Sequence, residues 1–422
     1  MTEPSTHHTT SVAIAGAGLS GLCLAQYLRL RGIDVRVYER DPGPFTRPQG
    51  YRITVDADGL TALRDSLPPH LYELAISAAG NPGGYFRFTD QRLRQAFKLS
   101  FDADDDAERQ MDRQVLRSVL LLGLEDRVHY RHEVTAVEPT ADGRALLRLE
   151  NGRHVTADAV IAADGIGSAL RDRIAPDGAP RDTGMAGVYG RTPLVQNGTR
   201  ILPDALDRSG VLALGDRTGR AVFFTTMEFA RPPAQAFARH APGAPAPDIE
   251  DYIMWGVVLP RPEIPAGAAV NDPVALRQLA LATAADHHPF IRRLIETSDP
   301  AATILSTFAA GSRPGPWALP NAAATGDAVH AMPPFGAHGG NTALRDAALL
   351  GAKLAAAYAA GGSSDAITAA LAAYRDEMIP YAFKAVDLAE GMMRRLTGSK
   401  GVQQWVMLKL LPSLHRPLLP AT

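Results

Sequence analysis

The residues with the clearest potential for chemistry form a glycine-rich segment near the start of the chain, Gly16-Ala17-Gly18-Leu19-Ser20-Gly21. A short apolar run over residues 11–15 precedes this segment, and helical apolar spacing follows it over residues 19–30. In such a strand, turn and helix, the first glycine permits the tight turn, the second lets the backbone approach a pyrophosphate, and the third allows close helix packing. The N-terminus of the helix adds free N–H groups and a positive dipole end. Gly16, Gly18 and Gly21 are therefore predicted to bind a dinucleotide.

An acidic residue, Glu39, ends the next apolar run at residues 34–39. Its carboxylate can accept hydrogen bonds from the hydroxyls of an adenosine ribose, and its charge disfavours a 2′-phosphate at that place. Arg40 follows directly and is assigned to the same cofactor site. A glycine motif alone is a weak signal, but a strand, a helix and an acidic partner in register strengthen it. These residues do not distinguish FAD from NAD, because both cofactors contain the same ADP half.

Two later segments resolve that choice. Ala163-Asp164-Gly165-Ile166-Gly167-Ser168-Ala169-Leu170-Arg171 follows one apolar strand-like run, and Thr325-Gly326-Asp327-Ala328-Val329-His330 follows another. The second continues through Pro333-Pro334-Phe335-Gly336-Ala337-His338-Gly339-Gly340-Asn341 to Asp346-Ala347. Together with the opening glycines, these motifs resemble the class A, or para-hydroxybenzoate hydroxylase-like, FAD-dependent monooxygenases over residues 12–347. All three motifs occur in the order of that family.

The Gly-Asp segment is expected to hold the flavin half of the cofactor. A carboxylate at the end of a strand can contact sugar-alcohol hydroxyls, and a turn that opens a helix can place N–H groups near a negatively charged flavin ring. By resemblance, Asp327 binds the ribityl chain and Gly339, Gly340 and Asn341 border the isoalloxazine ring. An alternative is that Asp327 merely caps a helix. The cofactor residues assigned to this segment are Gly326, Asp327, Pro333, Gly339, Gly340 and Asn341.

The resemblance also implies roles for four residues outside or within these motifs. Asp164 is expected to take part in handling both FAD and the nicotinamide cofactor, and Arg113 to reach the pyrophosphate or ribityl region unless it is a solvated helix residue. Arg52 is expected near the flavin as a catalytic residue. His338 stands where many relatives have glutamine. It is a second catalytic candidate because histidine titrates near neutral pH, although a passive hydrogen bond is the favoured role.

The overall composition excludes several other classes of function. The net charge of −2 and the pI near 6.6 give no attraction for nucleic acid or anionic lipid. Cys23 is the only cysteine, so an intramolecular disulfide and a cysteine metal site are ruled out, and no metal ligand is predicted. No apolar run reaches the ~18 residues of a membrane span, and residues 1–10 lack the features of a signal peptide. A cytoplasmic location is therefore expected.

The elements that must position these residues alternate between two regions. The pattern predicts an α/β fold in which a Rossmann-like FAD-binding domain with a parallel sheet is interleaved with a β-sheet-containing substrate domain. The FAD-binding domain is expected to comprise residues 11–75, 106–178 and 302–364, and the substrate domain residues 76–105 and 179–301. Residues 365–422 are expected to form C-terminal helices, whose apolar face after Gly401 packs on the substrate domain or on a partner subunit.

The resemblance implies a monooxygenase in which NADPH or NADH reduces FAD and a flavin hydroperoxide hydroxylates or epoxidises an apolar aromatic or polyketide-like molecule. The nicotinamide is expected to bind transiently, because no second nicotinamide-binding glycine motif is present. The protein is expected to be a monomer or homodimer. A non-redox cyclase of the same fold, with FAD as a scaffold, remains the alternative. A halogenase is disfavoured because W-x-W-x-I-P is absent around Trp255, and a degenerate binding module because all three glycine motifs are intact.

Overall fold

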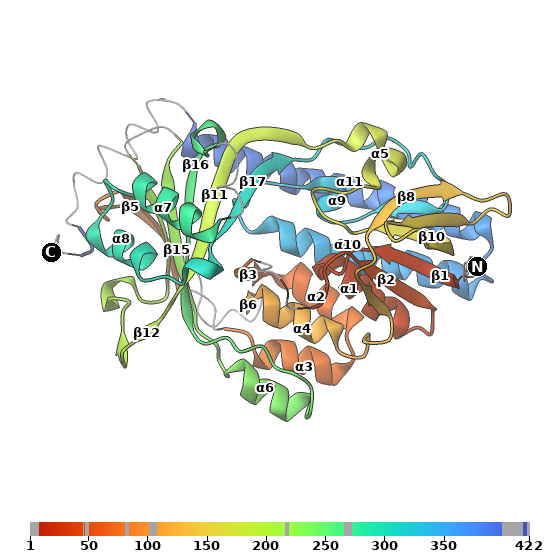
Figure 1. Cartoon of the computed structure of the whole chain (residues 1–422), viewed down its shortest axis with the longest axis horizontal. Helices are drawn as coiled ribbons and strands as arrows, with labels where there is room; N and C mark the ends of the chain where they lie inside the picture. The colour runs from red at the N-terminus through yellow and green to blue at the C-terminus, as the bar shows by residue number, and fades with distance from the viewer. Residues whose placement is uncertain are drawn as a thin grey trace.

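The computed structural model describes residues 8–44, 46, 50–80, 84–100, 108–215, 219–265, 272–398 and 417–419. These residues form two lobes that lie side by side, each built around a seven-stranded sheet (Figure 1). The first lobe contains the parallel strands, and the second contains a mostly antiparallel sheet. The mixed α/β class expected from the sequence, with a Rossmann-like region and a C-terminal helical segment, is confirmed.

The sheet of the first lobe is parallel at its centre and antiparallel at one edge. Across the sheet the order is β7 (Val128–Tyr130), β2 (Val35–Glu39), β1 (His8–Ala15), β10 (His154–Ala162), β9 (Ala145–Leu149) and β8 (Val134–Pro139), and β18 (Ala322–Ala324) also pairs with β10. Val12, Ala13 and Ile14 of β1 are completely buried. Continuous burial of this kind is typical of parallel strands that helices cover on both faces.

Two helices cover the strand that carries the glycine motif. Helix α1 (Leu19–Arg29) makes the crossover that the parallel strands β1 and β2 require. Helix α10 (His338–Ala359) packs on α1 at Gly351, where an added Cβ would lie 2.4 Å from the ring of Tyr27. The other helices of this region are α2 (Ala57–Ser66), α3 (Pro69–Ser77), α4 (Arg113–Leu121), α5 (Arg171–Ile174), α6 (Pro233–His240), α9 (Asp327–His330), α11 (Ser364–Thr397) and the turn Pro176–Gly178.

A small two-stranded sheet lies between the two lobes (Figure 1). It pairs β3 (Arg52–Val55) with β6 (Arg109–Asp112) in antiparallel register, so that Arg52 lies opposite Asp112. Both strands lead directly into helices, and the side chains of Asp56 and Asp112 cap α2 and α4. This small sheet therefore holds the starts of two helices of the first lobe against the second lobe.

The second sheet is the main body of the other lobe. Its order is β17 (Ile304–Ala310), β11 (Arg181–Pro193), β16 (Tyr252–Pro260), β15 (Ala221–Met227), β14 (Ser209–Leu214), β4 (Tyr85–Asp90) and β5 (Gln95–Ser100). Only the pairing of β14 with β4 is parallel in this sheet. The remaining elements are β12 (Val195–Gln196), β13 (Thr199–Arg200) and the short turns Asp204–Leu206, Arg261–Glu263 and Pro300–Ala302.

The two faces of this second sheet differ in what covers them. Helices α7 (Pro273–Thr283) and α8 (Pro289–Glu296) cover the outer face over a core that includes Trp255 and Phe224. His288 caps α8, because its side chain accepts a hydrogen bond from the N–H of Phe290. The opposite face carries a second cluster rich in aromatic side chains and contains Phe308 and other residues of the sheet. This inner face is the one turned toward the first lobe (Figure 1).

Helix α11 joins the two lobes. Its middle packs on α10 and on β10 and β18 of the first lobe, whereas Met393 near its end belongs to the apolar cluster of the second sheet. Glu390 of this helix also forms an ion pair with Arg181 of β11, at an N–O distance of 3.1 Å. The predicted C-terminal helix is therefore present, and it contacts both sheets.

One expected domain boundary is wrong. Residues 302–364 were expected in the FAD-binding domain, but β17 (Ile304–Ala310) pairs with β11 in the second sheet. Hydrogen bonding to a strand more than a hundred residues away is not visible in the local pattern, which explains the error. The other boundaries stay predictions. The apolar segment after Gly401 lies outside the described residues, apart from 417–419, where Leu418 bonds to Leu93.

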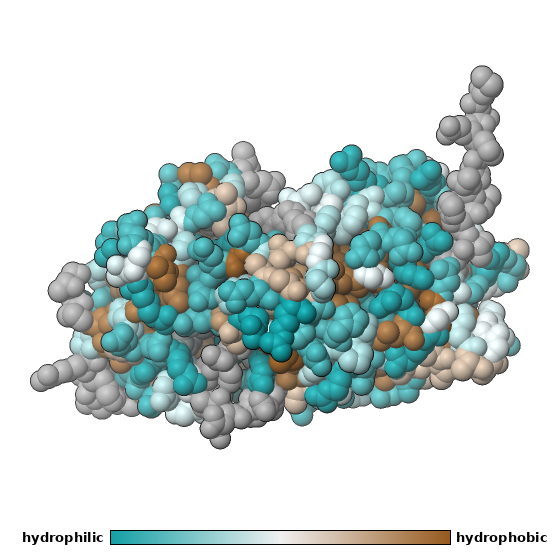
Figure 2. Space-filling model, turned by 90° about the horizontal axis from the view of Figure 1, so that it is seen from below, coloured by the Kyte–Doolittle hydropathy of each residue, from teal (hydrophilic) through white to brown (hydrophobic). Residues whose placement is uncertain are grey.

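No helix within the described ranges is long and apolar enough to cross a membrane. On the face of the molecule seen in Figure 2, apolar side chains form small separate patches among polar ones. Scattered apolar residues of this kind are ordinary for a protein surface. Cys23 is fully buried, and burial raises the pKa of its thiol to about 12, as is typical of a structural rather than a reactive cysteine.

Candidate functional site

The glycine loop rests directly on the end of β10. Gly16 has a φ of +102°, and an added Cβ there would lie 2.4 Å from the carbonyl oxygen of Ala163. A Cβ on Gly21 would lie 2.2 Å from the carbonyl oxygen of Gly16. A Cβ on Gly18, in contrast, meets nothing within 4 Å. The loop is thus closely packed on its inner side and open beside Gly18, where a pyrophosphate would fit.

The start of α1 offers hydrogen-bond donors to such an anion. Gly18 is the N-cap residue, and no side chain caps the helix. The first-turn N–H groups therefore lack an intrahelical partner and point out of the N-terminus together with the positive dipole end. This geometry agrees with the chemistry that a pyrophosphate requires.

Glu39 lies across the mouth of the loop. One carboxylate oxygen accepts a hydrogen bond from the N–H of Ala17 at 2.7 Å, and the other accepts one from the N–H of Asp41 at 2.9 Å. Its residue exposure is 6%. Each carboxylate oxygen has a further lone pair, so ribose hydroxyls can bond to the same group. Arg40 beside it is exposed.

Arg117, which the sequence analysis missed, anchors the same loop. Its Nε donates to the carbonyl oxygen of Ala17 at 2.8 Å, and one terminal nitrogen donates to that of Pro44. Only 3% of this residue is exposed. A buried arginine on an otherwise apolar helix face was the available signal, because arginine is rarely buried without a partner.

Asp164 presents a carboxylate oxygen without a partner. Its Oδ2 accepts a hydrogen bond from the N–H of Ala169 at 2.9 Å, whereas Oδ1 is buried and has no partner among the described residues. Burial raises the pKa of this carboxyl group. Unpaired buried polar atoms are costly, so this oxygen is a position where a ligand hydroxyl would stabilise the site.

Arg171 joins the segment around Asp164 to the Gly-Asp turn. Its Nε donates to the carbonyl oxygen of Ala328 at 2.7 Å, and a terminal nitrogen donates to that of Gly165 at 3.2 Å. Arg171 is the last residue of the Asp164 motif, and no role was predicted for it. It brings two of the three predicted motifs into direct contact.

The Gly326-Asp327 turn exposes its acidic side chain. Gly326 is the N-cap of α9 with a φ of 61° and a ψ of −144°, and no side chain caps that helix. Asp327 is exposed, whereas Ala328, Val329 and His330 after it are buried. The helix-cap alternative for Asp327 is therefore wrong. Its carboxylate is free to contact sugar-alcohol hydroxyls.

Helix α10 begins at His338, ahead of the glycines that were expected to form a turn before it. Gly339, Gly340 and Asn341 lie in its first turn rather than in a turn before it, because the helix starts at His338. Its N-cap, Ala337, has a φ of 58° and provides no side-chain cap. An added Cβ on Gly339 or Gly340 would have its nearest neighbour at 3.6 or 3.7 Å. The first turn of α10 thus combines small residues with uncapped N–H groups, which a ligand can approach. Pro333, which precedes this helix, is buried.

Asn341 connects this helix start to β3 and α2. Its Oδ1 accepts a hydrogen bond from the N–H of Asp56 at 3.0 Å, and its Nδ2 donates to the carbonyl oxygens of Thr54 and Ala337. A Cβ on Gly59 would lie only 2.4 Å from the same Oδ1. The side chain therefore aligns the start of α10 with the strand that carries Arg52. Contact between Asn341 and an isoalloxazine ring stays a prediction.

Arg52 lies at the seam between the lobes. Its Nε is buried without a partner in the described part of the chain, and burial lowers the pKa of its guanidinium to about 10. Across the seam, the hydroxyl of Tyr252 donates to the carboxylate of Asp112 at 2.8 Å, and Arg191 lies 5.8 Å from the Tyr252 ring. The hydroxyl of Tyr51 is also buried without a partner. Polar groups of both lobes thus meet at the β3–β6 sheet.

Arg113 is the first residue of α4, next to this seam. Its backbone N–H donates to the carbonyl oxygen of Tyr51 at 3.0 Å, and a Cβ on Gly50 would lie 3.5 Å from its Cδ. Arg113 is partly buried as a residue rather than fully solvated. Its contact with a cofactor stays a prediction.

His338 faces a small pocket of about 220 Å³. Its imidazole lies close to Gly336, where an added Cβ would be 2.9 Å from Nε2. The charged side chains that line the pocket are of both signs, with Asp56 and Asp58 acidic and Arg345 and Lys384 basic. The lining is formed by Asp56, Asp58, His338, Asn341, Thr342, Arg345, Tyr381, Lys384, Ala385 and Leu388.

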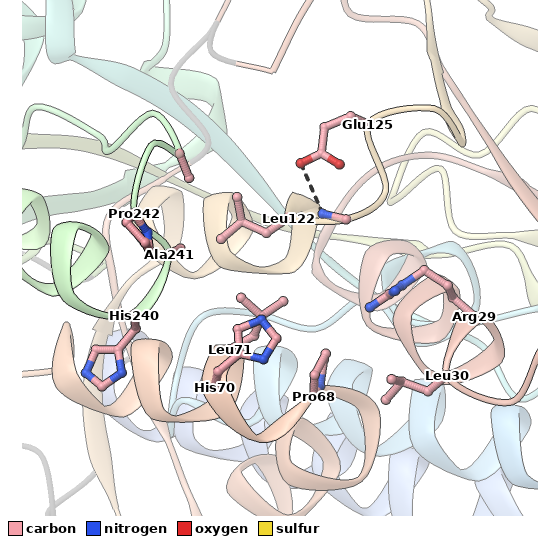
Figure 3. A pocket seen from close by; sticks show the side chains of 12 residues that line it. Arg29, Leu30, Pro68, His70, Leu71, Leu122, Glu125, His240, Ala241 and Pro242 are labelled. Atoms are coloured by element: carbon pink, nitrogen blue, oxygen red, sulfur yellow. Dashed lines mark hydrogen bonds between the residues drawn. The ribbon is translucent and has the colours of Figure 1, made fainter.

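A larger pocket, of about 670 Å³, lies at the opposite end of α1 from the glycine loop (Figure 3). Arg29, His70 and His240 project from α1, α3 and α6 around it. None of the predicted site residues lines this pocket. Within the described ranges, no group of three or more histidine, cysteine or acidic residues is arranged to hold a metal ion.

Comparison with protein families gives two matches to this chain. The family described as "FAD binding domain" matches residues 323–389, which include the Gly-Asp turn and α10. The family described as "NAD(P)-binding Rossmann-like domain" matches residues 14–74, which include the glycine loop and Glu39. The two matches therefore cover the glycine loop with Glu39 and the Gly-Asp turn with α10.

Similar proteins carry monooxygenase and hydroxylase names. The dual O-methyltransferase/FAD-dependent monooxygenase elcB of Phaeosphaeria nodorum is 32% identical over 456 residues, covering 93% of this chain and 46% of elcB. The CTB3 protein of Cercospora beticola, of the same description, is 32% identical over 80% of this chain and 41% of its own length. This chain thus spans about half the length of these relatives. The FAD-dependent urate hydroxylase of Mycolicibacterium vanbaalenii is 26% identical over 86% of this chain and 83% of its own.

Solved structures share the fold. A candidate FAD-containing monooxygenase of Photorhabdus luminescens has a TM-score of 0.75 at 26% identity, covering 92% of this chain and 98% of that one. Klebsiella pneumoniae HpxO, complexed with FAD and uric acid, has a TM-score of 0.71 at 21% identity, covering 97% and 94%. The three motifs, the fold and these relatives agree. The chain resembles FAD-dependent monooxygenases in sequence and fold, and FAD is its cofactor.

Proposed function

We propose that this chain uses NADPH or NADH and molecular oxygen to hydroxylate or epoxidise an apolar aromatic or polyketide-like small molecule. One observation carries this proposal: hydrogen bonds join the predicted cofactor motifs to one another and to β3. Ser20 of the glycine motif bonds to Thr325 at 2.9 Å, Arg171 joins the Gly-Asp turn to the Asp164 segment, and Asn341 joins α10 to β3.

We assign each part of FAD to one of these motifs. The amides at the start of α1 would hold the pyrophosphate, Glu39 the adenosine ribose, and Asp164 and Asp327 the ribityl hydroxyls. The uncapped start of α10 would place N–H groups beside the ring, where they stabilise negative charge. When bound, FAD supplies the two-electron chemistry that lets a nicotinamide cofactor and oxygen react at one centre.

The inner face of the second sheet suits an apolar, flat substrate. Tyr189 lies over Gly187 and Gly256, because a Cβ on either glycine would be 2.6 Å from its ring atoms. One side of this ring is therefore held against the sheet, and the residue is partly exposed. Aromatic rings favour stacking with other flat apolar groups. The inner-face aromatic residues near it include Phe86, Phe88, Phe97, Phe223 and Phe308.

The reaction balances with one oxygen molecule per turnover. One oxygen atom enters the substrate, the other becomes water, and the nicotinamide supplies the two electrons as hydride together with a proton from solvent. The names of the similar proteins support this class of reaction, and the fungal relatives elcB and CTB3 support a role in secondary metabolism.

A single turnover under labelled oxygen tests the proposal. Purified protein reconstituted with FAD is incubated with NADPH or NADH and a panel of aromatic and polyketide-like compounds. We expect one compound to accelerate nicotinamide oxidation and to gain one labelled oxygen atom by mass spectrometry. Product that forms without oxygen and without nicotinamide would instead identify a non-redox cyclase in which FAD is a scaffold.

A further inference from the structure

A fully buried polar cluster lies directly behind the Gly326-Asp327 turn. His330 and Asp346 are both 0% exposed, and His330 Nε2 lies 2.5 Å from Asp346 Oδ2. Neither residue has a role in the proposed function. A buried carboxylate is costly unless charge and hydrogen bonds compensate it, so the presence of this cluster requires a reason.

Asp346 accepts hydrogen bonds from three different elements. Its Oδ2 accepts from the N–H of Gly326 at 3.0 Å, from His330, and from the hydroxyl of Thr325 at 3.3 Å. Its Oδ1 accepts from the hydroxyl of Tyr381 on α11 at 2.7 Å. Asp346 itself lies on α10. One carboxylate therefore ties the end of β18, the start of α9, α10 and α11 together.

The bond to Gly326 controls where the next side chain points. Gly326 has a φ of 61° and a ψ of −144°, a conformation that residues with a Cβ avoid. Its N–H group is fixed by Asp346, and Asp327 follows at once. Asp327 is exposed, while the three residues after it are buried. The orientation of Gly326 thus determines the direction of the Asp327 carboxylate.

His330 stabilises the charged carboxylate of Asp346 that holds Gly326. Burial by itself lowers the pKa of His330, but the carboxylate of Asp346 raises it overall, and the pKa of Asp346 is lowered by His330 despite burial. The two groups therefore stabilise each other in their charged forms. Nδ1 of His330 has no partner in the described part of the chain, so the polar interaction of the ring goes to Asp346.

We infer that Asp346, with His330 as its hydrogen-bond partner, is a positioning residue that fixes the Gly326-Asp327 turn for the ribityl chain before FAD binds. This inference rests on the proposed function because it takes FAD to lie along Asp327. Preorganisation of this kind raises affinity by reducing the ordering that binding would otherwise require. Thr325 extends the arrangement to the glycine motif, because its hydroxyl also contacts that of Ser20.

The Asp346→Asn variant tests the inference. Asparagine keeps the shape, but its NH₂ group cannot accept a hydrogen bond, so Gly326, His330 and Tyr381 lose part of their acceptor. We expect the Kd for FAD, measured by quenching of flavin fluorescence on addition of apoprotein, to rise at least about tenfold. Thr192→Val is the matched control, since it removes a buried 2.7 Å bond to Leu294 in the other lobe. It should lower the thermal stability without changing the Kd.

Two substitutions of His330 separate positioning from packing. Glutamine can keep an N–H donor directed at Asp346, and leucine cannot. We expect His330→Gln to stay within about threefold of the wild-type Kd for FAD and His330→Leu to resemble Asp346→Asn. These two variants decide the matter even if Asp346→Asn does not fold.

Hydrogen exchange of the apoprotein gives a measurement that needs no cofactor. Peptides covering residues 322–331 should exchange faster in Asp346→Asn and His330→Leu than in the wild type or in Thr192→Val. Unchanged exchange there, or a Kd that changes equally in Asp346→Asn and Thr192→Val, would overturn the inference. Wild-type protein that binds FAD but transfers no oxygen would instead contradict the proposed function and leave this ranking of Kd values intact.

Discussion

The glycines of the cofactor loop are required for two different physical reasons. Gly16 and Gly21 are required by the protein itself, because a Cβ on either would collide with a backbone carbonyl. Gly18 has no such neighbour, so its lack of a side chain matters only when a ligand approaches. The same residue type thus serves folding at two positions and binding at the third.

Substitution Gly18→Val should abolish FAD binding while the protein still folds. The added side chain would fill the space beside the loop without meeting the protein, so it would exclude the pyrophosphate. Flavin absorbance of the purified protein and a titration with FAD measure this. Gly391→Val is the control, because a Cβ at Gly391 also meets nothing within 4 Å and lies on α11. A yellow Gly18→Val protein would contradict the assignment of the loop.

Substitution Asp327→Ala should weaken FAD binding by roughly 1–3 kcal/mol, the usual cost of losing hydrogen bonds to a charged group. The apoprotein should keep its stability, because Asp327 is exposed and does not cap α9. Isothermal titration of the apoprotein with FAD gives the affinity, and thermal unfolding gives the stability. If stability falls and affinity does not, the role of Asp327 is structural.

Substitution Asp164→Asn should stabilise the apoprotein at neutral pH. Because burial raises the pKa of Asp164, the folded state disfavours its charge, and stability is lost as the pH rises from the ordinary aspartate range through the raised pKa. Below that range both states are protonated, and the two proteins should be equally stable. Thermal unfolding of both apoproteins between acid and neutral pH measures this. A wild-type apoprotein that gains stability relative to the variant as the pH rises would refute it.

At the scale of elements, the start of α10 is set by contacts that are distant in sequence. Asn341 bonds to Asp56 and to Thr54, and both bonds span more than 280 residues. The contact between Arg117 and Ala17 likewise spans 100 residues. Local motifs therefore predicted the glycine loop, Glu39 and the Gly-Asp turn. They did not predict Arg117, the contacts of Asn341 or the first residue of α10, because those depend on which elements meet in three dimensions.

Substitution Asn341→Ala should destabilise the apoprotein by about 2–6 kcal/mol, since it leaves the N–H of Asp56 and the carbonyl of Thr54 unpaired at roughly 1–3 kcal/mol each. Unfolding in urea, followed by circular dichroism, measures the change. Thr342→Val removes only a bond within α10, from Thr342 to the backbone of His338, and should cost less than about 1 kcal/mol. Equal losses in the two variants would show that the link from α10 to β3 adds no stability.

At the scale of the whole molecule, two lobes enclose the seam where the flavin ring is expected. The strands of the second sheet come from three separate stretches of the chain, and β17 returns to it after most of that sheet is complete. The sequence pattern indicates which segments are strands and that two domains are interleaved. It does not indicate that β17 pairs with β11, because pairing between strands that are distant in sequence depends on how whole sheets pack.

In the proposed reaction, a reduced flavin exposed to oxygen without substrate would waste reductant as hydrogen peroxide. We propose that Arg52 of β3 contributes to preventing this loss: burial lowers the pKa of its guanidinium, and Tyr252 on the other side of the seam raises it in part. Its unpartnered Nε can donate to an oxygen of the flavin or of the substrate.

Substitution Arg52→Gln should therefore raise the amount of peroxide formed for each nicotinamide oxidised and lower the amount of product, while FAD content stays unchanged. Peroxide and product are quantified in parallel, with the best substrate from the labelled-oxygen screen. Arg200→Gln is the control, because Arg200 pairs with Glu228 and Asp207 on the exposed surface of the second lobe. An unchanged ratio of peroxide to product in Arg52→Gln would remove Arg52 from the candidate catalytic residues.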